Sequence, residues 1–268
     1  MSGQTVEKNP ATATRTAGLG LAMRAEWVKL WTVRSTWWTV LALVVLGAGL
    51  TTVICWGNAD WLANDQEESP GSFITWGMMI AQVCAVIVGT LAVTSEYGTG
   101  MIRTTLAAVP GRGRVFLAKT VVVCGVLFVT GTVTALLGYV GGNYFLDREG
   151  IGMALEGDVA RSMYGSGLYL AALGLLAMAV GFLMRHTAAA ISIVLATVFV
   201  IGNMVMLIPG DLGVWITKLM PGNAASSLVA PVSFNPDALG AWTGFGVLLA
   251  EVGVLCALAW WLLDRRDA

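Results

Sequence analysis

Few residues in this sequence carry the side chains that metal binding or nucleophilic catalysis requires. His186 is the only histidine, and the four cysteines (Cys55, Cys84, Cys124 and Cys256) stand singly in or at the ends of apolar stretches. A zinc site or a disulfide framework usually shows closely spaced cysteines such as CxxC, a pattern that this sequence lacks. One histidine excludes a multi-histidine metal site and makes a histidine-based triad unexpected. We therefore interpret the cysteines as small packing residues.

One run is similar to a nucleotide-binding motif. Residues 113–120 read GRVFLAKT, which resembles a phosphate-binding P-loop with Ala118 in place of the second glycine. A working P-loop follows a strand and opens a helix, whereas this run opens a long apolar stretch, and no Walker B pattern follows it. We therefore expect no nucleotide to bind here. If the third span starts as early as Val115, Lys119 is expected to extend its ammonium group toward the lipid headgroups.

The elements that carry these residues are predicted to be membrane helices. Hydrophobic residues make up 57% of the chain and charged residues 12%, which is too apolar for a soluble or a disordered protein. The net charge of −1 provides no basic face, so no nucleic acid partner is expected. About 20 apolar residues cross a bilayer, and six stretches are long enough: Trp37–Trp56, Phe73–Val93, Thr120–Val140, Tyr164–Met184, Ala188–Ile208 and Ala241–Leu263. The predicted fold class is an all-α polytopic membrane protein.

The basic residues predict the orientation of these spans. Twelve of the 15 Lys and Arg residues fall before the first span, after the second, after the fourth or after the last. By the positive-inside rule these segments are cytoplasmic, so both termini are expected to be cytoplasmic. Residues 1–17 are predicted to be a disordered tail, and residues 18–268 a single transmembrane domain.

An amphipathic helix is predicted between the tail and the first span. Leu19, Met23, Trp27, Leu30 and Trp31 recur at the spacing of one helical face, and the basic residues lie off that face. Such a helix is expected to lie on the cytoplasmic leaflet, with its tryptophans at headgroup level. The alternative is that it extends the first span into the cytosol.

Segments outside the spans carry further expectations. Residues 141–163 are rich in glycine and acidic residues, which predicts a solvated outer loop. Residues 209–240 contain four prolines and only three charged residues, so this stretch is predicted to dip into the membrane, with a plain surface loop as the alternative. The GxxxG spacings at Gly138–Gly142 and Gly240–Gly244 fit close helix packing, either within the chain or between two copies.

Glu251 is the one acidic residue inside a predicted span. A carboxylate near the middle of a bilayer costs about 2.5–3.5 kcal/mol on insertion scales, unless it faces protein or water or is protonated. Two interpretations stay open. Either Glu251 faces a translocation path or a dimer interface and contacts a transported molecule, or it is a packing residue, bonded to Thr243, Asn203 or a carbonyl group.

The loop over residues 94–114 has the most distinctive pattern. Glu96 stands where the second span ends, a semi-polar stretch long enough for a short helix follows, and Pro110 with neighbouring basic residues ends it. The apolar residues Met101, Leu106 and Val109 in a cytoplasmic loop favour docking onto another protein. Taken alone, the loop fits a simple connector equally well.

This pattern resembles the cytoplasmic loop of the type-2 ABC exporter permeases. Glu96, Gly100, Arg103, Pro110 and Arg112 match the positions that the family uses there, whereas Met101 replaces the usual threonine. The segment over residues 26–38 is also similar to the start of the family before its first span. The resemblance in topology covers the whole chain, with the coupling loop after the second span and a re-entrant segment before the sixth.

The resemblance implies a mechanism and partners. A member of this family is the permease subunit of an ATP-driven exporter and is not itself an enzyme. It pairs with a second permease, identical or homologous, and with two separate ABC-type ATP-binding subunits, which bind ATP and Mg²⁺, so no cofactor is expected on this chain. Loop 94–114 would be the coupling helix, and the chain would reside in the bacterial plasma (inner) membrane.

Functions of other classes have weaker support in the sequence. An ion-coupled secondary transporter is the alternative, but it would use several intramembrane ionisable groups and often repeated halves with broken helices. This chain offers one such acid. A membrane enzyme would need a histidine cluster, a Ser–His pair or paired carboxylates in the spans, and none is present in the sequence.

Overall fold

The computed structural model describes residues 18–64, 68–108, 111–235 and 237–265, which are mostly helical with no strand among them. Six helical segments are long and apolar enough to cross a membrane, which confirms the predicted all-α membrane fold. They are α2 (Arg34–Asn64), α3 (Met78–Gly98), α5 (Arg112–Arg148), α6 (Gly157–Met184), the segment Thr187–Val205 and α12 (Ala241–Arg265).

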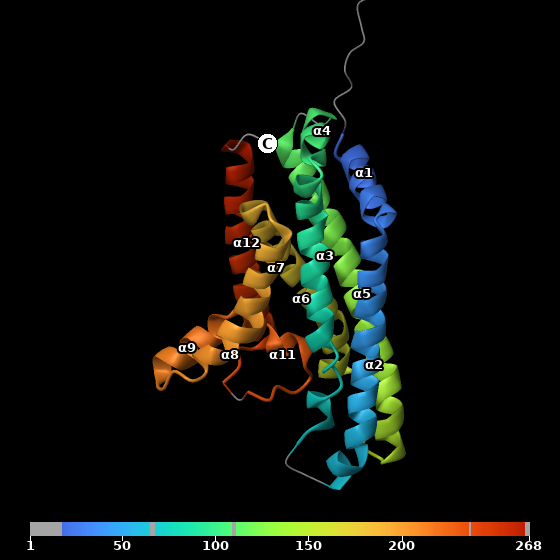
Figure 1. Ribbon diagram of the computed structural model, residues 1–268. Coiled ribbons are helices and arrows are strands. Elements are labelled where there is room, and N and C mark those ends of the chain that lie inside the picture. The colour runs from blue at the N-terminus through green and yellow to red at the C-terminus, as the bar shows by residue number, and fades with distance from the viewer. Residues whose placement is uncertain (1–17, 65–67, 109–110, 236, 266–268) are drawn as a thin grey trace, which may run out of the picture.

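Shorter elements occupy the two ends of this bundle. The start of α1 (Leu19–Thr32), α4 (Met101–Ala108) and the end of α12 share one end, named here the α4 end (Figure 1). The fifth span, Thr187–Val205, consists of α7 (Thr187–Leu195), the π-helix η2 (Ala196–Ile201) and α8 (Gly202–Val205). The remaining short elements are η1 (Pro70–Ser72), α9 (Asp211–Leu219), α10 (Pro221–Ala224) and α11 (Ser226–Val229).

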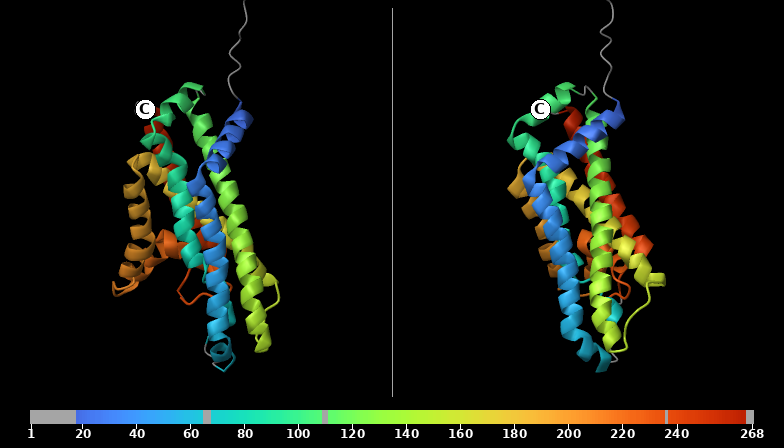
Figure 2. Two further views of the ribbon diagram at one scale, coloured as in Figure 1. Left: turned by 45° about the vertical axis from the view of Figure 1, so that its right-hand side comes forward. Right: turned by 90° about the vertical axis from the view of Figure 1, so that its right-hand side faces the viewer.

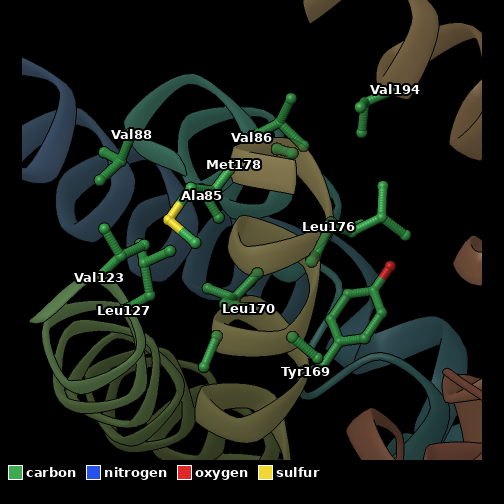
Figure 3. Close-up of a cluster of buried hydrophobic side chains, with 14 of the residues drawn as sticks. Ala85, Val86, Val88, Val123, Leu127, Tyr169, Leu170, Leu176, Met178 and Val194 are labelled. Carbon is green, nitrogen blue, oxygen red and sulfur yellow. The ribbon is translucent and has the colours of Figure 1, made fainter. Parts of the chain in front are cut away.

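Helix α6 is the centre of the molecule. It packs against α3, α5, α7, α11 and α12, and 78% of its most apolar 18-residue segment is buried. Figure 3 shows how Leu170 and Met178 of α6 meet Val86 of α3 and Leu127 of α5 in one apolar cluster. The core is therefore formed by α3, α5 and α6, with the other spans placed around it.

Glycines set how closely these helices approach. A Cβ atom built on Gly89 of α3 would lie 2.1 Å from the carbonyl oxygen of Gly174 in α6, so α3 does not tolerate a larger residue at this crossing. On α5, Gly138 and Gly142 face Thr51 and Cys55 of α2. The first predicted GxxxG spacing is therefore used for packing within the chain.

Helices α2 and α5 are longer than their predicted spans. Their 31 and 37 residues correspond to about 46 and 55 Å, beyond the ~30 Å of a hydrocarbon core. Figure 2 shows them side by side, extending past the rest of the bundle at the end opposite α4. The prediction of a loop over 141–163 was wrong at both ends, because α5 runs through Arg148 and α6 begins at Gly157.

The extra turns form because they bury apolar surface of their own. Cys55, Ala59 and Leu62 of α2 pack with Leu146 of α5 and Ile74 in a second, smaller core. This burial stabilises helix beyond the membrane-length segment, since tertiary packing contributes more to helix stability than propensity does.

Two other spans depart from their predicted bounds. Residues 73–77 form turns, so α3 begins at Met78, and the rings of Phe73 and Trp76 stack with centroids 5.4 Å apart. The fifth span is interrupted by η2, in which the N–H of Gly202 donates to the carbonyl of Thr197. Hydropathy alone does not distinguish these local geometries from a continuous α-helix.

Helix α1 is a separate element that packs on the bundle. Val33, in an extended conformation, breaks the helix before α2, so α1 does not simply extend the first span. Its buried residues are Ala22, Glu26 and Leu30, and it packs mainly on α5, while Leu19 and Trp27 of the predicted apolar face are exposed. The buried face is thus rotated from the predicted one. Contact of the exposed tryptophan with lipid stays a prediction.

The proline-rich segment 209–240 forms the short helices α9, α10 and α11. Leu228 of α11 is fully buried, and its carbonyl group faces Gly165 of α6, while the carbonyl of Ala224 faces Gly244 of α12. This segment is therefore anchored against α6 and α12. Its predicted entry into the membrane stays a prediction.

Candidate functional site at the α4 end

The short helix α4 is set at an angle to α3 by one glycine. Gly100 adopts φ +71°, a left-handed conformation that residues with a Cβ atom seldom adopt. Beyond this turn Ile102 is 4% exposed and fixes α4 to the bundle, while Met101 and Arg103 are exposed. The helix thus presents an apolar and a basic side chain outward at the tip of the molecule.

Directly beneath α4 lies a cluster of four charged side chains, named here the charge cluster: Glu26 and Lys29 of α1, Glu96 of α3 and Lys119 of α5. Lys119 Nζ lies 2.5 Å from Glu26 Oε2 and 2.8 Å from Glu96 Oε1. Lys29 Nζ lies 2.8 Å from Glu26 Oε1 and 3.1 Å from Glu96 Oε1. Each lysine therefore contacts both glutamates, and three helices meet in one network.

Three of the four side chains are almost completely removed from solvent, while the side chain of Lys29 is 28% exposed. Lys119 is 2% exposed, Glu96 4% and Glu26 6%. Such charges carry a large desolvation penalty, which only close opposite charges and hydrogen bonds offset. The two positive and two negative charges balance, so the network is neutral as a unit.

Lys29 links the cluster to α4. Its ammonium group donates to Thr105 Oγ1 of α4 at 3.1 Å in addition to its two glutamate contacts. Burial acts to lower the pKa of Lys29, but the hydrogen bonds and negative charges of Glu26 and Glu96 outweigh it and hold the pKa above its usual 10.5. Lys29 therefore stays charged at neutral pH, and α4 is attached to α1 as well as to α3.

A comparison with protein families agrees with this architecture. The family model of the ABC-2 family transporter proteins matches residues 22–203, well over half of the chain and the region that runs from α1 through the charge cluster into α8. The chain belongs to the ABC-2 transporter family. It is a membrane-spanning permease subunit of an ABC transporter. A search of curated proteins returned no significant match.

Three of the predicted coupling residues of this ABC-2 permease are in described positions near α4. Gly100 makes the turn, Arg103 is exposed on α4, and Glu96 points inward to Lys29 and Lys119. Glu96 therefore links α3 to α1 and α5, and the role of these residues in coupling stays a prediction. Pro110 lies outside the described residues.

Arg112 begins α5 and contacts the end of α12. Its Nη1 atom donates to the carbonyl oxygens of Leu263 and Asp264, at 2.8 and 2.9 Å. A cation bound to the free carbonyls at a helix C-terminus is favourable. This arginine of the ABC-2 permease therefore connects the loop after α4 to the last span, a contact that the sequence pattern does not reveal.

The expectation for Lys119 was wrong. This side chain does not extend to lipid headgroups but is buried between two glutamates. The P-loop-like run 113–120 lies inside α5, with its backbone in helical hydrogen bonds. The sequence did not identify Glu26 and Lys29 as members of a site, although charged residues beside apolar spans signal a need for partners. Glu251 lies on α12, apart from the cluster, and lines a separate cavity.

Proposed function

We propose that this ABC-2 permease is the transmembrane half of an ATP-driven exporter, and that α4 and the charge cluster receive the motion of a separate ATP-binding subunit. In this proposal two permeases, identical or homologous, pair in the bacterial plasma membrane with two ATP-binding subunits that hold ATP and Mg²⁺. The α4 end and both termini face the cytoplasm.

The observation that carries the proposal is the attachment of α4. A push on this helix acts on α1 through the Lys29–Thr105 hydrogen bond, and on α3 directly through the turn at Gly100. Because Glu96 and Lys119 join α3 to α5, these helices would move as one body. Packed interfaces respond to such forces by discrete shifts rather than by continuous deformation.

The exposed side of α4 supports docking to another protein. Met101 is 42% exposed, and Arg103 is exposed beside it. Methionine and arginine are both enriched in protein interfaces. In an exporter this surface would enter a groove of the ATP-binding subunit.

A crosslinking experiment tests the proposal. A photo-crosslinking amino acid at Arg103 in the full chain, expressed in its native membrane, is expected to capture a protein with Walker motifs. The same group at the exposed Arg148, at the opposite end of α5, is the matched control and is expected to capture none. Equal capture at both positions, or capture at neither, would contradict the proposed docking.

Charge reversal provides the functional counterpart. Arg103→Glu is expected to lower ATPase activity of the assembled complex several-fold while leaving its expression unchanged, because the side chain is exposed. Arg148→Glu serves as the control for a change of two charge units. Glu96 is unsuitable for this test, since its reversal would also disrupt the charge cluster. ATP-driven accumulation of a solute in inside-out vesicles would establish the export direction.

A further inference from the structure

A wide groove opens between two spans on the side of α6 that faces away from α2. Helices α7 and α12 both pack on α6, and between them lies a cavity of about 580 Å³. Its walls include Val180 of α6, Ile193 of α7 and Val254 of α12, and Pro221 of α10 closes one side. Cavities of roughly 300–1,000 Å³ with mainly apolar walls are typical of small-molecule sites.

Glu251 brings the one charged group to this groove among the described residues that line it. Its Oε2 atom is buried and has no hydrogen-bond partner in the part of the chain that the structure describes. Asn203, which the sequence suggested as a partner, instead donates to the carbonyl of Phe199. An unpaired buried carboxylate oxygen is costly, and a positively charged group in the groove would offset that cost.

A second feature of the groove, on the wall opposite Glu251, points to a ligand independently. Thr197 lines the groove and belongs to the π-helix η2, whose wider turns interrupt the fifth span. Short π-helical segments are rare and are found frequently at functional sites. The irregular helix and the unpaired acid thus face one cavity from opposite sides.

We infer that this groove binds lipophilic cations, molecules with an apolar body of drug size and one positive charge. The apolar walls remove the body of such a molecule from water, while the charge pairs with Glu251 in a medium of low dielectric constant, where the attraction is strong. A neutral apolar molecule leaves the carboxylate uncompensated, and an anion is repelled. As an assignment of the transported substrate class, the inference rests on the proposed export function; the binding itself does not.

Equilibrium binding of radiolabelled tetraphenylphosphonium to the full chain in nanodiscs tests the inference. Tetraphenylborate, which has the same shape and the opposite charge, is the matched ligand, and empty nanodiscs correct for partition into lipid. We expect saturable binding of the cation and none of the anion. Glu251→Gln keeps the side-chain shape but cannot ionise, and is expected to weaken cation binding by about tenfold, whereas Glu156→Gln, in an exposed loop, should have no effect.

A steric pair of variants locates the site. Val254→Phe fills part of the groove and should weaken cation binding, whereas Leu258→Phe, one turn further along α12 and outside the lining, should not. Equal affinity of the wild type and Glu251→Gln would overturn the inference. So would an intermolecular disulfide formed by Val254→Cys, because it would assign the groove to contact with a second copy.

Failure of the two proposals can be distinguished. Cation binding that depends on Glu251, without any ATP-binding partner or ATP-driven transport, would contradict the export function and leave the binding site standing. Assembly with an ATP-binding subunit and stimulated ATPase activity, without cation binding, would contradict the cation site and leave the export function standing.

Discussion

Each lysine of the charge cluster contacts both glutamates, and this sharing makes the four residues one unit. Buried ion pairs are weak evidence for stability, because desolvation consumes much of the Coulomb attraction. Their removal is nevertheless asymmetric, since the loss of one member leaves its partners charged and buried. The cluster therefore specifies how α1, α3 and α5 meet more than it adds to the free energy of folding.

Lys119→Met tests this asymmetry. The substitution leaves Glu26 and Glu96 with Lys29 alone, and we expect the free energy of unfolding to fall by roughly 3–5 kcal/mol. Thermal unfolding in detergent, followed by size-exclusion chromatography, measures the effect. Lys218→Met is the control: its partner Asp237 is largely exposed and 3.9 Å away, so a change below about 1 kcal/mol is expected.

A double substitution should reverse much of the loss. Glu96→Gln combined with Lys119→Met removes one charge of each sign and leaves Lys29 paired with Glu26, 2.8 Å away. We expect the double variant to be more stable than Lys119→Met alone. Additive destabilisation by the two changes would mean that the four residues do not act as a network.

The raised pKa of Lys29 predicts how the free energy of unfolding changes at alkaline pH. Its folded-state pKa lies above 10.5, so its stabilising contribution is fully present below the unfolded-state pKa and is lost as the pH rises through the folded value. The difference in unfolding free energy between the wild type and Lys29→Met should be constant from pH 7 to about pH 10 and shrink at higher pH. A difference that grows above pH 10 would contradict the assignment.

At the scale of helices, close packing depends on small residues at a few crossings. Gly89 of α3 lies against the backbone of Gly174 in α6, whereas Gly125, within α5, has no atom within 4 Å of the Cβ position. Substitution by alanine is therefore expected to have opposite effects on stability at these two helical glycines.

Gly89→Ala should force α3 and α6 apart and destabilise the fold by about 1–3 kcal/mol. Gly125→Ala meets no obstacle and improves helix propensity, so it should be neutral or stabilise by up to about 1 kcal/mol. Thermal unfolding of both variants provides the comparison. Equal behaviour would indicate that the helices are farther apart than the structure has them.

The sequence predicts elements better than contacts between them. The six spans follow from hydropathy because burial in lipid acts on each helix separately, and a short helix after the second span was expected from the length of the semi-polar stretch that Pro110 ends. The charge cluster does not follow, since Glu26, Glu96 and Lys119 are brought together only by tertiary packing. The extensions of α2 and α5 were missed for the same reason: Leu146 and Cys55 stabilise each other across helices.

At the scale of the whole molecule, the arrangement of ends predicts sidedness. The start of α1, α4 and the end of α12 lie together, whereas the loop 149–156 lies at the other end of α5 (Figures 1 and 2). An even number of spans places the start of the first span and the end of the last span on the same side of the membrane. In the proposed orientation the α4 end is cytoplasmic.

Thiol labelling of intact cells measures this orientation. A cysteine at Glu156, which is exposed, should react with a membrane-impermeant maleimide, whereas one at Thr104, exposed on α4, should react only after the membrane is permeabilised. Two of the native cysteines are buried and two partly buried, so they should add little background. Labelling of position 104 in intact cells would reverse the orientation and exclude docking of a cytoplasmic ATPase on α4.

Lys29 and Lys119 have a consequence for the biogenesis of the chain. Both belong to the basic residues that predict a cytoplasmic α4 end, a rule that reflects charges sensed while the spans are being inserted. After folding, the same ammonium groups are neutralised by Glu26 and Glu96. These lysines therefore act twice, first as topogenic signals and later as internal partners, so the fraction of correctly inserted chains and the stability of those chains are separate quantities for any substitution at either position.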